Sequence, residues 1–90
     1  MKSLFPLGQL VATPGALALL QDDGQEYTHL IYRHVRGDWG NIDPGDRGMN
    51  DDAVRNGDRI LSVYNLASGK VWVITEADRS STTILLPSEY

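Results

Sequence analysis

Residues 59–87, RILSVYNLASGKVWVITEADRSSTTILLP, decide the fold of this chain. The segment contains three runs rich in β-branched and aromatic residues, a composition typical of strands: RILSVYNL, KVWVITEA and STTILLP. The connections between them, ASG and DRS, are short and contain turn-forming residues. Each pair of neighbouring runs is therefore expected to form a hairpin. The sequence predicts an antiparallel β-meander over residues 59–87.

The segment before the meander has the end signals of helices. Thr13 is a suitable N-cap, Pro14 suits the first helical position, and Gly24 is able to stop the helix between them. In EYTHLIYRHVRG the apolar side chains recur at helical rather than alternating spacing, which predicts a second helix that ends at Gly37.

A third helical region is expected before the meander. Asp43 and the proline after it favour a single helical turn. Asn50 is a plausible N-cap for a separate helix of about two turns over 50–56. Asp51 and Asp52 would then lie in its first turn, where carboxylates are favoured, and the glycine after residue 56 would close it.

These elements predict one α+β domain over residues 1–90, with a helical half at 13–57 and the β-meander at 59–87. Two to three short helices are expected to pack on a three- or four-stranded antiparallel sheet. A strand at residues 7–12 would supply the fourth strand. A chain of 90 residues that is 41% hydrophobic has material for one modest core.

The composition argues against several kinds of protein. The chain has no cysteine, which excludes disulfides and thiolate metal sites. Its first twenty residues are largely apolar, but Pro6 and Pro14 interrupt the run, so neither a signal peptide nor a membrane span is predicted. We therefore expect a cytoplasmic protein.

The negative charge of the chain is concentrated in one segment. Residues 38–58 contain six aspartates against Arg47 and Arg55, which equals the net charge of −4 of the whole chain. This balance argues against direct nucleic-acid binding, which requires a basic surface. It favours an acidic surface that binds a basic protein surface. The predicted partner-binding residues are Trp39, Asp43, Asp46, Asp51, Asp52 and Asp58.

Trp39 and the aspartates also have structural interpretations. Trp39 lies between two glycines in GDWG, where it would either plug the core beside a tight turn or serve as an exposed aromatic anchor. The aspartates of DPGDRGMNDDAV do not alternate as calcium ligands do, and the twelfth residue is Val54 rather than glutamate. No phosphate-binding glycine pattern is present. No metal or cofactor is expected.

His34 is the catalytic candidate, with Asp38 four residues later as the group that would orient it. The alternative is structural: His34 lies within the apolar stripe of the second predicted helix, where it would bond a backbone carbonyl of the following loop. A small hydrolase or nuclease would need His34 and a carboxylate to meet Arg36, Arg59 or Arg79 in one pocket. No Ser–His–Asp set can be assigned from the sequence.

Four segments together resemble a family of short bacterial proteins carried on plasmids and integrative conjugative elements: LGQLVATPGALALL, RHVRGDWG, NDDAVRNGDRILSVY and VWVITEADRSSTTILLPSEY. The resemblance covers nearly the whole chain, and the last motif is the most specific. It implies an accessory protein of a mobile element, among which inhibitors of host defence are common. It supplies no catalytic residues.

The sequence leads to one functional expectation and two alternatives. We expect a non-enzymatic protein-interaction module that acts through an acidic surface, with inhibition of a CRISPR or restriction system as its sharpest form. The first alternative is the small hydrolase or nuclease. The second is a homodimer of structural role, joined through sheet edges or through an exposed sheet face.

Overall fold

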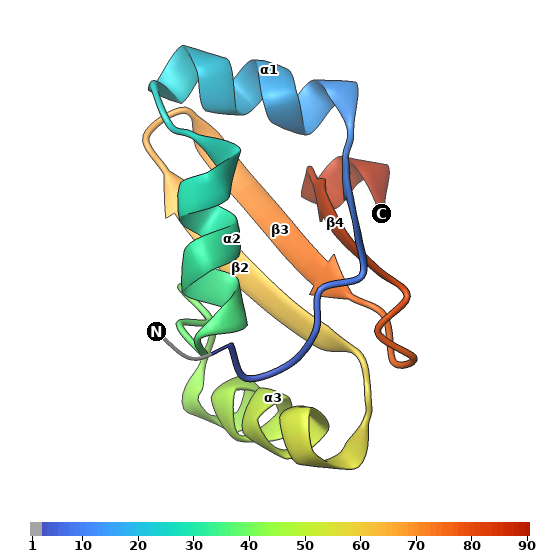
Figure 1. The fold of residues 1–90 in the computed structure, drawn as a ribbon. Coiled ribbons are helices and arrows are strands. Elements are labelled where there is room, and N and C mark those ends of the chain that lie inside the picture. The colour runs from blue at the N-terminus through green and yellow to red at the C-terminus, as the bar shows by residue number, and fades with distance from the viewer. Residues whose placement is uncertain (1–2) are drawn as a thin grey trace.

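The computed structural model describes residues 3–90, in which three helices pack on a four-stranded sheet (Figure 1). The strands are β1 (Gln9–Ala12), β2 (Ile60–Leu66), β3 (Gly69–Thr75) and β4 (Ser81–Leu85). The helices are α1 (Pro14–Asp23), α2 (Tyr27–Val35) and α3 (Pro44–Asn56), and a short 3-10 turn, Pro87–Glu89, follows β4. The predicted α+β fold is confirmed. None of the helices within these residues is long and apolar enough to cross a bilayer.

The strand order is β1-β4-β3-β2, so the predicted meander is confirmed and β1 supplies the fourth strand. The predicted antiparallel pairing is observed for β2, β3 and β4, but the fourth strand departs from it, because β1 pairs with β4 in parallel. The reason lies in the N-terminal arm. Phe5 is buried beside Trp39 near α3, so the chain starts at that end of the sheet. It must then run away from α3 to reach α1, in the same direction as β4 (Figure 1).

The ends of α1 and α2 follow the local sequence signals. The Thr13 hydroxyl accepts a hydrogen bond from the Ala16 N–H at 3.1 Å, and Gly24 ends α1 in the left-handed conformation with φ 69°. After α2 the chain turns at Gly37, whose φ is 90°. Only glycine adopts such angles without a steric cost, so both predicted stops are confirmed.

The third helical region differs from the prediction. Instead of one turn followed by a separate helix over 50–56, α3 is continuous from its start at Pro44. The Asp43 carboxylate caps its N-terminus by accepting from the Asp46 N–H at 2.9 Å. At the other end, the Arg79 guanidinium donates to the Ala53 carbonyl at 2.8 Å. These contacts stabilise the two ends of the helix and help to offset the two glycines inside it.

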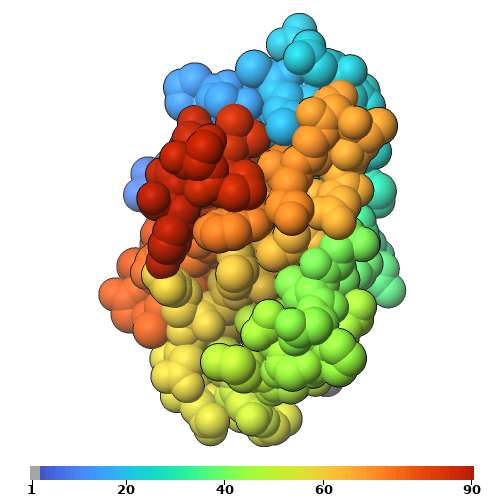
Figure 2. Space-filling view, turned by 180° about the vertical axis from the view of Figure 1, so that it is seen from behind, coloured from blue at the N-terminus to red at the C-terminus, as the bar shows by residue number. Residues whose placement is uncertain are grey.

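The two faces of the sheet have different surroundings. On one face, α1 and α2 bury a core that includes Leu20, Leu30, Tyr64 and Val73. The opposite face, called the back face below, carries no helical layer. Figure 2 shows the yellow and orange surface of β2 and β3 uncovered between the green segment and the red C-terminus. Side chains of alternate strand residues, such as Trp72, therefore remain partly exposed there.

The outer edge of β2 is already occupied. The Asn50 side chain donates to the Leu61 carbonyl at 2.6 Å and accepts from the Leu61 N–H at 3.2 Å, as a neighbouring strand would. Further along, the loop 39–41 bonds the N–H and carbonyl of Val63, and Asn41 accepts from the Asn65 N–H. Because these groups are paired, β2 offers no edge for the addition of another strand.

Candidate functional site

His34 lies in the core rather than in a pocket. It is 0% exposed, and its ring is surrounded by the helix face of the sheet, Phe5 and Trp39. Its Nδ1 is 2.6 Å from the Ser62 hydroxyl and its Nε2 is 2.8 Å from the Thr75 hydroxyl. The predicted structural role is therefore observed, although the expected bond to a loop carbonyl is not. The partners are strand hydroxyls instead.

Donors and acceptors can be assigned to the hydrogen bonds around His34 in only one consistent way. The Thr82 hydroxyl donates to the Leu7 carbonyl at 2.8 Å, so its oxygen must accept from Thr75, 2.7 Å away. The Thr75 oxygen then accepts from the Nε2–H of His34, because a hydroxyl carries one proton. The neutral ring consequently accepts at Nδ1 from Ser62. This chain of bonds links α2 to three strands and to the N-terminal arm.

The electrostatics of His34 also fit a structural group. Burial lowers the pKa of His34 to about 3, because the charged imidazolium would lose its hydration without gaining a counter-ion. Asp38 does not face the ring. Its carboxylate accepts from the Arg33 guanidinium at 2.7 Å, and this hydrogen bond lowers the pKa of Asp38. The His34–Asp38 pair that acid–base catalysis would need is not formed.

The arginines proposed for an active site point elsewhere. Arg36 stacks over the Tyr32 ring, and Arg59 lies over the Tyr90 ring. Arg79 donates to backbone carbonyls near the end of α3. None of these contacts brings a guanidinium to His34, so the pocket required by the hydrolase alternative is not assembled among residues 3–90.

Trp39 is not an exposed anchor, and that prediction is wrong. Its side chain is 2% exposed, stacks on Phe5 with 6.2 Å between ring centroids, and packs against the edge of His34. Its Nε1–H donates to the Asp51 carboxylate at 3.0 Å. The ring is buried because the glycines on either side let the loop turn beneath α2, as the structural interpretation of GDWG predicted.

The predicted acidic residues are exposed but surround α3 rather than sharing one face. At 3.6 residues per turn, Asp51 projects about 140° away from Asp46 around the helix axis. Asp51 accepts from Trp39, while Asp52 pairs with Arg55. Their predicted place in a first turn is wrong, since α3 begins well before them. The acidic α3 surface is defined as the following residues: Asp43, Asp46, Asp51, Asp52 and Asp58.

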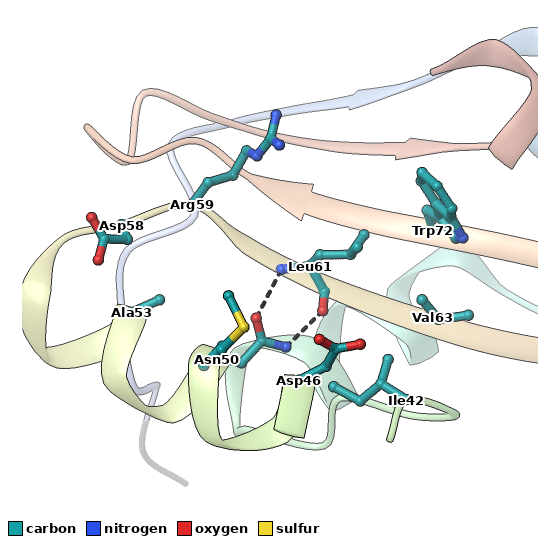
Figure 3. Close-up of a pocket in the computed structure, with 10 residues that line it drawn as sticks. Ile42, Asp46, Asn50, Ala53, Asp58, Arg59, Leu61, Val63 and Trp72 are labelled. Carbon is teal, nitrogen blue, oxygen red and sulfur yellow. Dashed lines mark hydrogen bonds between the residues drawn. The ribbon is translucent and has the colours of Figure 1, made fainter. Parts of the chain in front are cut away.

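A cleft adjoins this surface on the back face of the sheet. The back-face cleft has a volume of about 540 Å³ and lies between α3 and the uncovered strands. It is lined by Ile42, Asp46, Met49, Asn50, Ala53, Asp58, Arg59, Leu61, Val63 and Trp72. Figure 3 shows Asp58 and Arg59 toward one end of the cleft and Trp72 toward the other, with the Asn50–Leu61 hydrogen bonds on its floor.

The cleft has an apolar floor and a charged rim. Leu61, Val63 and Trp72 give an apolar floor, and Met49, which is 70% exposed, gives a flexible apolar wall. The polar group in the floor, the Asn50 amide, has both its oxygen and its nitrogen bonded to Leu61. Asp46 and the other charged side chains are exposed at the rim.

The sequence did not predict Asn50 and Leu61 as parts of a site. The available signal was the apolar character of both faces of the strands over 59–66 and 70–77, which indicates a surface left without a covering layer. Trp72 is partly exposed on that face, whereas Ile74, two residues later in the same strand, is buried. Tyr64 is buried under the helices.

Within the described residues, no three His, Asp or Glu side chains lie close enough to hold a metal ion. The chain matches no protein-family model, and it has no significant match among curated proteins or solved structures. The cleft and the acidic α3 surface are therefore the features of this protein that indicate a function.

Proposed function

We propose that this protein is a non-enzymatic interaction module that binds a basic protein surface through the acidic α3 surface and the back-face cleft. The observation that carries the proposal is the cleft itself: an uncovered apolar floor whose rim carries the exposed carboxylates of Asp46 and Asp58 beside Arg59. An apolar patch with a polar rim is the usual composition of a protein-binding site. The site takes a protein segment that presents lysine or arginine beside apolar side chains.

The charge of the site supports the choice of partner. Residues 43–58 contain five aspartates against Arg47 and Arg55, and all these side chains are exposed. A local excess of negative charge accelerates the approach of a basic partner and repels nucleic acid. Burial of the cleft floor and of Met49 would then supply affinity, because desolvated apolar contacts at the centre of an interface dominate its energy.

A more specific form of the proposal is an inhibitor of a CRISPR or restriction complex, encoded by a mobile element. This form rests on the sequence resemblance to plasmid and conjugative-element proteins, and the charge of the α3 surface is consistent with it. Defence complexes that handle nucleic acid expose basic channels, which an acidic module is able to occupy by mimicking the charge of phosphates.

The proposal is tested by charge reversal at the cleft rim. Asp46→Lys with Asp58→Lys changes two exposed rim residues whose side chains make no hydrogen bond within residues 3–90. The matched control, Asp22→Lys with Glu26→Lys, makes the same change in net charge at the α1–α2 junction. Tagged wild type and both variants are used for affinity capture from the native host, with quantitative mass spectrometry.

The expected result is a protein captured by the wild type and by the control but depleted at least about tenfold with the rim variant, since two reversed charges remove and then oppose the attraction. If the control variant lost the captured protein to the same extent, the loss would come from the change in net charge and not from the cleft rim. Equal capture by all three proteins would remove the cleft rim from the interface.

A further inference from the structure

The two edges of the sheet are not equivalent, and the β1 edge is open. In the parallel pairing with β4, the Gln9 N–H donates to Ser80 and the Thr13 N–H donates to Ile84. The alternation of a strand then turns the N–H and carbonyl of Leu10 and of Ala12 toward the outside. No group of residues 3–90 bonds these outward atoms, whereas the corresponding atoms of β2 are paired.

Apolar side chains accompany this open edge. Leu10 and Val11 are 48% and 43% exposed, and Leu17 and Tyr27 are exposed to a similar extent. A hollow of about 280 Å³ lies between the edge and the helices, lined by Leu10, Val11, Ala12, Leu17, Tyr27 and Ile84. Edge strands of isolated monomers usually carry charges, proline or a bulge that prevents pairing. β1 has none of these devices.

The distribution of charge favours a second copy of the chain as the partner of the open β1 edge. Residues 3–21 contain no charged side chain, although the whole chain has a net charge of −4. Two copies therefore approach through this edge without like charges facing each other, while their acidic α3 surfaces stay at the far edges of the sheet. An antiparallel strand pair around a two-fold axis is also self-complementary, as a symmetric dimer requires.

We propose that β1 pairs with β1 of a second copy, antiparallel around a two-fold axis at Val11. In this register Leu10 lies opposite Ala12 of the other copy, and the outward groups form about four hydrogen bonds. The Leu10 side chain of each copy then covers the apolar hollow beside Ala12 of the other. The two Val11 residues face each other as a non-hydrogen-bonded pair on the back face, with their Cα atoms about 4.5 Å apart.

The dimer has a continuous sheet with the order β2-β3-β4-β1-β1-β4-β3-β2. Because α3 lies beside β2, the two acidic α3 surfaces stand at opposite ends of this sheet. The self-association is independent of the proposed function. It would nevertheless make the protein bivalent toward any partner that binds the acidic α3 surface.

Charged substitutions at Val11 test the register. Wild type is expected to have the mass of a dimer in sedimentation equilibrium. Val11→Lys and Val11→Glu each place like charges directly opposite one another and should raise the dimer dissociation constant on the order of tenfold or more. An equimolar mixture of the two variants should dimerise again, because opposite charges then face each other. The control Met49→Lys introduces a charge at an exposed apolar residue away from β1 and should leave the dimer intact.

Single-cysteine variants give a second measurement that does not depend on the charged variants folding. The chain has no cysteine, so any disulfide must join two introduced residues. Val11→Cys should cross-link rapidly under mild oxidation, because the facing Cα atoms are within disulfide range. Gln9→Cys lies on the same face but about 13 Å from its counterpart in this register, so it should not. A monomeric wild type, a mixture that stays monomeric, or equal cross-linking of the two cysteine variants would overturn the proposal.

Discussion

Acidification from pH 7 to pH 5 should destabilise this protein through His34. The ring contacts Ser62, Thr75, Phe5 and Trp39, none of which carries a charge. Burial lowers its pKa to about 3 in the folded protein, against 6.5 for the ordinary side chain. Below pH 6.5 the unfolded chain therefore binds a proton at His34, while the folded chain does not. The contribution of His34 to stability is fully present above that pH and is lost as the pH decreases.

The size of the loss in stability follows from the difference between the pKa of His34 in the folded and in the unfolded chain. Each pH unit below 6.5 lowers the free energy of unfolding by about 1.4 kcal/mol, until the pH approaches the pKa of His34 in the folded protein. Between pH 7 and pH 5 the free energy of unfolding should therefore decrease by about 2 kcal/mol from this residue alone. The loss is a large fraction of the stability of a domain of this size.

Urea unfolding followed by tryptophan fluorescence measures this loss, because Trp39 is buried against the His34 ring. His34→Gln removes the titrating group while it retains a donor and an acceptor, so its stability should be lower at pH 7 but nearly equal at pH 5 and pH 7. His29→Gln changes the exposed histidine and should keep the wild-type pH dependence. A wild type that loses no stability by pH 5, or a His34→Gln variant that loses as much as the wild type, would refute the reasoning.

Three further predictions concern contacts that fix α3, and urea unfolding at pH 7 tests each of them. Asn50→Ala should destabilise by about 2 kcal/mol, because it leaves the N–H and carbonyl of Leu61 without partners beside a buried position. Arg79→Ala should cost about 1 kcal/mol more than Arg79→Gly, since both lose the contacts with α3 but only alanine is strained at φ 60°. Trp39→Phe should cost at least about 1 kcal/mol through lost packing and the lost bond to Asp51, and a variant as stable as the wild type would contradict that bond.

The elements that the sequence predicted well are those specified by local signals. The meander follows from three β-rich runs and two short turns, and all three strands form where these runs lie. The limits of α1 follow from Thr13 and Gly24, whose effects reach only a few residues along the chain. Such signals act in any context, so they can be interpreted without knowledge of the rest of the fold.

The continuity of α3 shows where local signals are insufficient. Asn50 is a plausible N-cap, which predicts a separate helix over 50–56, and two glycines in PGDRGMNDDAVRN lower the propensity for one continuous helix. The helix is held by contacts with distant residues, namely Asn50 with Leu61 and Ala53 with Arg79. Tertiary contacts of this kind override propensity, and their partners lie 11 and 26 residues apart in the chain, beyond the reach of local capping signals.

The sequence by itself determined the strands of the meander, the caps of α1 and the location of the negative charge. Only the tertiary structure decided that β1 joins β4 in parallel, which of its two predicted roles Trp39 takes, and that the aspartates surround α3. It also decided that His34 bonds two strand hydroxyls and that a cleft remains on the back face. The physical reason is that composition and hydrogen-bonding type are properties of each residue, whereas burial and partnership depend on residues far apart in the chain.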